Sequence, residues 1–97
     1  MLYLRKLREI LNDVPDHRTR LDVASTVNYL ANLFSRGTIN EEQLKEELTK
    51  ILVEVLDYTQ PSSPEELKNR AESVAQDLIR AIKVDTVSRR VAARLRR

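Results

Sequence analysis

Apolar residues recur three or four positions apart along most of the chain, and this spacing is the feature that most constrains its fold. An α-helix has 3.6 residues per turn, so residues with this spacing share one face, whereas a half-buried strand needs strict alternation. No segment alternates β-branched and polar residues as a strand would. The pattern therefore predicts an all-α protein.

Local start and stop signals divide the first part of the pattern into two helices. The first covers about residues 2–13, and Pro15 ends it because the residue before a proline resists the helical conformation. The second begins at Pro15 or Asp16 and ends at Arg36. Gly37, the only glycine, follows where a left-handed residue commonly terminates a helix.

Two further helices begin with capping sequences. Asn40 is a good N-cap, and Gln43 three positions later can complete a capping box. Ser63 and Glu66 form the corresponding pair for the fourth helix. Pro64 lies in the first turn of that helix, where its missing N–H has no partner to lose.

We expect the apolar stripes of the four helices to form one core. Ninety-seven residues are enough for a single domain with one core, here residues 1–97. Helices of this length with short connections predict a four-helix up-down bundle. The residues predicted to form the core are Leu4, Leu7, Leu11, Val14, Val23, Val27, Leu30, Phe34, Leu44, Leu48, Ile51, Val55, Tyr58, Leu67, Ala71, Val74, Leu78 and Ile82.

Residues 84–97 form a basic amphipathic C-terminal segment whose apolar residues leave the stripe of the fourth helix. At about 100° per residue, they fall on the side of a helix opposite Leu78. Either the helix breaks at residues 83–86 and a short fifth helix folds onto the bundle, or one helix continues and its far face meets another chain. We favour the break, because Asp85 or Thr86 could cap a new helix. The C-terminal apolar stripe consists of Val84, Val87, Val91 and Leu95.

Charge is distributed unevenly, although the net charge is only +2. Residues 41–57 carry six acidic residues against two basic ones, and residues 83–97 carry six basic residues against one acidic residue. The guanidinium group can form two hydrogen bonds to a phosphate or a carboxylate, so we expect an anionic partner at the C-terminal segment. The arginines there are Arg89, Arg90, Arg94, Arg96 and Arg97.

Residue types needed for catalysis or metal binding are scarce. The chain has no cysteine, and its only histidine, His17, is best interpreted as an exposed turn residue. One glycine is too few for a phosphate-binding loop. We therefore expect no enzyme activity, no metal, no cofactor and no small-molecule substrate. The longest apolar run has three residues, 51–53, so we also expect a cytoplasmic protein without a membrane span.

These observations favour a non-enzymatic interaction module or small accessory subunit. We expect it to dock through the C-terminal apolar stripe on a protein partner or on a second copy of itself. The alternative is sequence-independent nucleic-acid binding through the C-terminal arginines, although no aromatic residue lies among them to stack on bases. We do not expect membrane attachment, because the stripe contains neither Trp nor Phe.

Overall fold

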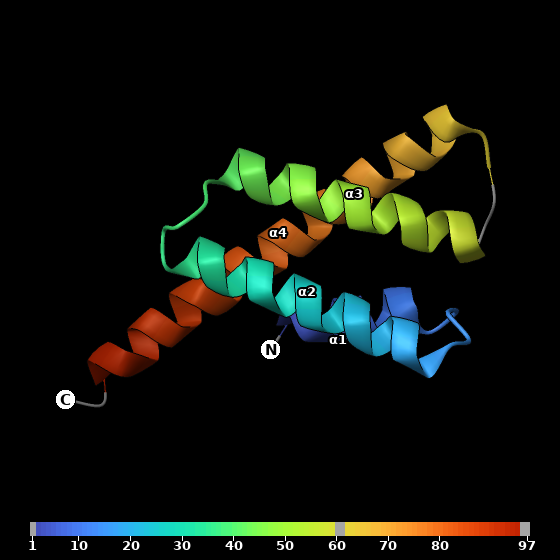
Figure 1. The fold of residues 1–97 in the computed structure, drawn as a ribbon. Helices are drawn as coiled ribbons and strands as arrows, with labels where there is room; N and C mark the ends of the chain where they lie inside the picture. The colour runs from blue at the N-terminus through green and yellow to red at the C-terminus, as the bar shows by residue number, and fades with distance from the viewer. Residues whose placement is uncertain (1, 60–61, 96–97) are drawn as a thin grey trace.

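The computed structural model describes residues 2–59 and 62–95, and in these ranges it contains four α-helices and no strand (Figure 1). Successive helices run in opposite directions, so the predicted all-α, four-helix up-down bundle is confirmed. The helices are α1 (Leu2–Leu11), α2 (His17–Ser35), α3 (Glu41–Thr59) and α4 (Pro64–Leu95).

The ends of α2 follow from local hydrogen bonds. Asp16 is its N-cap, and one carboxylate oxygen accepts the N–H of Arg18 at 3.2 Å. At the other end Gly37 has a φ of 77°, the left-handed conformation that a side chain would oppose. The N–H of Thr38 then donates to the carbonyl of Leu33 at 2.9 Å, and the N–H of Gly37 donates to Phe34 at 3.0 Å. This pair of bonds is a Schellman motif, and it turns the chain toward α3.

The predicted capping residues of α3 make both expected contacts, and those of α4 make one of the two. The N–H of Asn40 donates to Oε1 of Gln43 at 2.9 Å, and the N–H of Gln43 donates to Oδ1 of Asn40 at 2.8 Å. The N–H of Glu66 donates to the hydroxyl of Ser63 at 3.3 Å. Each contact satisfies a helix-end group that has no partner within its own helix.

The helix pairs do not pack equally. Helix α4 lies along α3 and α1, and α2 packs mainly on α3, whereas α1 and α2 contact each other only sparsely. The molecule is elongated, with principal extents of 51, 27 and 17 Å. Three sides of the four-helix arrangement are therefore closed, and the side between α1 and α2 is more open.

Most residues predicted to form the core are buried or half-buried, and two are not. Leu4 is exposed because it faces the open side between α1 and α2, and the neighbouring Tyr3 is buried in its place. The Tyr3 hydroxyl donates to Oδ1 of Asn28 in α2 at 2.5 Å. Tyr58 is exposed because it lies at the surface where α3 passes the start of α2, and its hydroxyl end can remain in water.

Helix α4 continues without a break through residues 83–86, so the favoured prediction of a short fifth helix is wrong. Asp85 does not cap a new helix, because its carboxylate is directed at the start of α1. The Thr86 hydroxyl donates back to the carbonyl of Ile82 at 2.9 Å, a contact that fits within a continuing helix. As a result α4 has 32 residues, and its C-terminal end extends past the other three helices (Figure 1).

Candidate interaction site

Asp85 attaches α4 to the bundle just before the helix extends past the other helices. This residue is only 9% exposed, and its two carboxylate oxygens accept the N–H groups of Leu2 at 2.9 Å and Tyr3 at 3.0 Å. The first N–H groups of a helix lack partners inside the helix, and a negative charge there also complements the helix dipole. Asp85 therefore acts as a cap for α1 that is supplied by a different helix.

Two more contacts join α4 to its neighbours within the same turn. The Thr86 hydroxyl lies 3.0 Å from the hydroxyl of Ser35 at the end of α2. Lys83 forms an ion pair with Glu41 at the start of α3. Together with Asp85, these residues attach α4 to all three other helices over residues 83–86.

Beyond residue 86 the helix has no cover from the bundle. Every residue whose exposure is described from Val87 to Leu95 is exposed. We call residues 87–95 the projecting end of α4; it leads away from the bundle in Figure 1. These residues continue a 32-residue helix, so their helical conformation needs no new nucleus, although they gain little from packing.

The C-terminal apolar stripe remains uncovered in the single chain. Its four side chains are between 48% and 79% exposed, with Val91 the least and Leu95 the most exposed. Because α4 is one continuous helix, they lie on one face, which is opposite the face that buries Leu78. The structure therefore brings the predicted residues together but does not fold them onto the bundle. The exposed stripe consists of Val84, Val87, Val91 and Leu95.

The described arginines of this segment are also exposed. The side chains of Arg89, Arg90 and Arg94 make no ion pair or hydrogen bond with the residues that the structure describes. Burial raises the pKa of the Tyr3 hydroxyl, and the positive charge of nearby Arg89 opposes part of that rise. The other two predicted arginines, Arg96 and Arg97, lie outside the described residues.

The acidic start of α3 does not neutralise these arginines. Glu41 pairs with Lys83, and Lys50 lies 3.8 Å from Glu46 and 3.5 Å from Glu47. The nearby lysines thus take up most of this negative charge. The projecting end keeps its positive charge as well as its apolar face.

No group of three or more His, Cys, Asp or Glu residues that could hold a metal ion occurs in the described parts of the chain. His17, the only histidine, is exposed at the first position of α2. Among the helices described here, none is long and apolar enough to cross a membrane.

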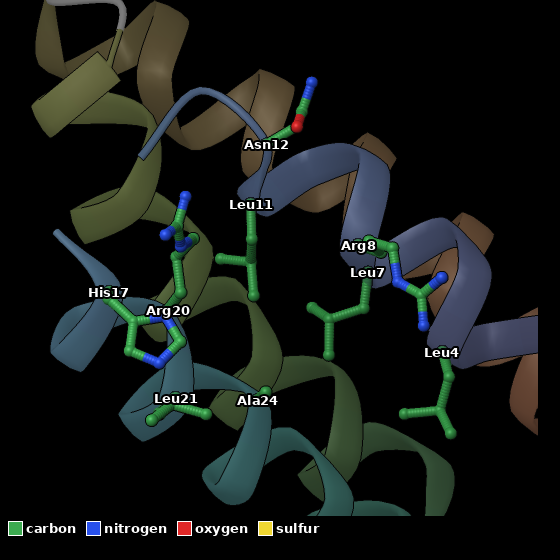
Figure 2. Close-up of a pocket in the computed structure, with 9 residues that line it drawn as sticks. All are labelled: Leu4, Leu7, Arg8, Leu11, Asn12, His17, Arg20, Leu21 and Ala24. Atoms are coloured by element: carbon green, nitrogen blue, oxygen red, sulfur yellow. The ribbon is translucent and has the colours of Figure 1, made fainter. Parts of the chain in front are cut away.

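A groove between α1 and α2 is a second candidate surface, and sequence reasoning missed it (Figure 2). It has a volume of about 470 Å³, and Leu4 and Leu21 lie exposed at its edge. Leu21 lies about 120° around α2 from Val27, away from the main stripe of that helix. The position of Leu21 outside the main stripe is the one feature of the sequence that could have indicated the groove. It could not be interpreted from the sequence alone, because the sparse packing of α1 against α2 is known only from the structure. The lining residues are Leu4, Leu7, Arg8, Leu11, Asn12, His17, Arg20, Leu21 and Ala24.

Comparison with known proteins found no match to this chain among protein-family models, curated proteins or solved structures.

Proposed function

We propose that the protein is a non-enzymatic interaction module that docks on a partner protein through the projecting end of α4. The observation that supports this most is the exposed apolar stripe on a helix end that no other part of the bundle covers. A helix with an apolar face typically binds in a hydrophobic groove, where the i, i+3, i+4 and i+7 side chains serve as anchors. Val84, Val87 and Val91 have this spacing.

Burial of the stripe provides a useful but limited free energy. Complete burial of one such side chain is worth about 1.5–3 kcal/mol, and the stripe side chains are still 48% to 79% exposed. The four together would then contribute on the order of 4–7 kcal/mol. Association costs at least about 4 kcal/mol, so the apolar stripe alone gives weak binding. The neighbouring arginines must add to the contact.

The charge on the projecting end favours an acidic partner over a second copy of the same segment. Pairing two projecting ends would bring Arg89, Arg90 and Arg94 of each copy close together. The only acidic residue of the segment, Asp85, is buried and already binds two N–H groups. Like charges across an interface cost several kcal/mol, whereas carboxylates on a partner would pair with these arginines.

Nucleic-acid binding is the second candidate, and three exposed arginines whose side chains have no partner among the described residues support it. Neutralising about three phosphates would lower the affinity roughly 40-fold between 50 and 200 mM salt. Nucleic-acid binding through the arginines would not bury the apolar stripe, and the projecting end carries no aromatic residue for base stacking. We therefore place it second.

Site-specific photo-crosslinking tests the proposed docking. A benzoylphenylalanine replaces Val91 in the full chain, and in a matched control it replaces Ser73, an exposed polar position of α4 within the bundle. We expect a discrete crosslinked protein from position 91 in extract of the source cells, none from position 73, and loss of the product when Val87→Glu is added. Identical crosslinking from both positions would refute docking through the projecting end.

Two measurements test whether the partner is instead a second copy of the chain or a nucleic acid. Light scattering of the full chain at low and high salt tests for a second copy, and a monomer at all concentrations is expected. Labelled single- and double-stranded nucleic acids titrated at 50 mM salt test the second candidate. Tight binding that is abolished by changing Arg90 and Arg94 to Glu, combined with no protein crosslink at position 91, would replace the first proposal with nucleic-acid binding.

A further inference from the structure

Two hydrogen bonds lie at the ends of the groove between α1 and α2. At one end the Tyr3 hydroxyl bonds to Asn28 at 2.5 Å, and at the other Nη1 of Arg20 donates to the carbonyl of Val14 at 3.1 Å. Between these hydrogen bonds α1 and α2 pack only sparsely. The groove lies between these two contacts, on α1 and α2 rather than on the projecting end of α4.

The floor and edges of the groove are aliphatic. Leu7 and Leu11 of α1 are buried at its base, and Leu4 and Leu21 are 38% and 54% exposed at its rim (Figure 2). From Leu4 to Leu11 the groove leucines of α1 cover seven helical steps, which is about 10.5 Å along the helix axis. This length matches two turns of another helix, the span over which anchors at i, i+3 or i+4, and i+7 are presented.

The polar residues of the groove are basic or neutral. Its lining contains two arginines, the histidine and one asparagine, and no acidic residue. Arg8 lies beside Leu4 and Leu7, and Arg20 lies with His17 at the opposite end of the groove (Figure 2). Arg8 makes no ion pair or hydrogen bond within the described ranges, so its charge is available to a ligand. An anionic partner complements this surface.

We propose that this groove binds an acidic amphipathic helix from a partner protein. Guanidinium groups at both ends suit a partner with several carboxylates, whereas an aliphatic acid carries only one. Leu4 and Leu21 at the rim also remain well exposed, whereas small-molecule sites usually enclose most of their ligand. A second copy of this chain does not fit, because its exposed apolar helix end is basic, and the leucines of its acidic helix α3 are buried in the core.

NMR with the full-length, isotope-labelled protein tests this proposal. The probe is a 16-residue peptide with a covalent staple to hold it helical, leucines at i, i+4 and i+7, and glutamates on both flanks. We expect chemical-shift changes at amides of residues 4–11 and 17–24. A control peptide with lysine in place of every glutamate should bind at least about tenfold more weakly, since like charges then meet at the rim.

Variants of the protein locate the contact. Leu21→Glu and Arg8→Glu should each weaken binding of the acidic peptide at least about tenfold. Arg80→Glu on the solvent face of α4 and Tyr29→Ser on α2 are matched exposed controls and should leave binding unchanged. All four positions are exposed, so circular dichroism should show the same fold in each variant.

Three results would overturn the proposal. They are no shift of the groove amides at millimolar acidic peptide, equal binding of the lysine peptide, and undiminished binding by the Leu21→Glu variant. Decanoate is a further probe, and shifts of the groove amides by decanoate but not by the acidic peptide would instead assign the site to aliphatic carboxylates. The outcome is independent of the crosslinking at position 91, because that position lies on a helix that does not line the groove.

Discussion

Replacing Asp85 with alanine should destabilise the protein more than any other single change to a charged side chain in the described residues. The substitution removes both acceptors of the Leu2 and Tyr3 N–H groups, and the Tyr3 N–H is buried. A hydrogen bond to a charged group is worth about 1.5–3 kcal/mol, and loss of a helix cap typically costs about 1 kcal/mol. These overlapping contributions give an expected loss of about 2–4 kcal/mol in the free energy of unfolding.

Urea denaturation followed by circular dichroism at 222 nm measures this loss. For a chain of this size, a loss of 2 kcal/mol corresponds to a decrease of roughly 8–16 °C in the melting temperature. Asp85→Asn retains one acceptor oxygen and should lose about 1–2 kcal/mol. The matched control is Asp77→Ala, which removes an exposed i,i+3 ion pair with Arg80 and should change stability by less than about 0.5 kcal/mol. If Asp85→Ala were as stable as that control, the cap on α1 would contribute nothing.

Three further predictions concern other parts of the fold. Gly37→Ala should lower stability by about 1–2 kcal/mol in urea denaturation, because the φ of 77° opposes a side chain although no atom lies within 4 Å of an added Cβ; an unchanged midpoint would contradict this. A chain ending at Ser88 keeps the contacts of residues 83–86, so it should melt within about 2 °C of the full chain yet lose binding by the projecting end. The hydrogen bond from the Thr19 hydroxyl lowers the pKa of the Asp16 carboxyl group in the folded protein. The ionised carboxylate therefore stabilises the fold fully above the unfolded-state pKa, and this stabilisation is lost as the pH falls through the lower folded-state pKa. Thr19→Ala should raise the Asp16 pKa in an NMR titration, and no rise would refute that cause.

The helix boundaries could be predicted because the interactions that set them are local. Asn40 and Gln43 are three residues apart and satisfy each other, and Gly37 needs only its own backbone conformation to end α2. The core stripes of α3 and α4 were likewise predictable, because helical periodicity places Leu48 and Leu78 on inward faces regardless of the partner helix.

The continuity of α4 could not be predicted, because it depends on a contact across the whole chain. Asp85 is a plausible local cap in sequence, but its carboxylate binds N–H groups 82 and 83 residues away. The open side between α1 and α2 depends on how closely two helices approach, which periodicity does not specify. Leu4 was therefore assigned to the core, although it lies at the rim of the groove.

The unbroken course of α4 makes it a rigid spacer for anything bound at its tip. The helix contains no glycine, and its one proline, Pro64, is its first residue, so nothing in its sequence favours a hinge. Nine residues of helix extend about 13 Å, so a ligand bound at the tip would be held at about that distance and in a fixed direction. Inserting four residues after Thr86 would move that ligand about 6 Å further out and turn it by about 40°. The position of the tip relative to the bundle therefore depends on the number of helical residues between them.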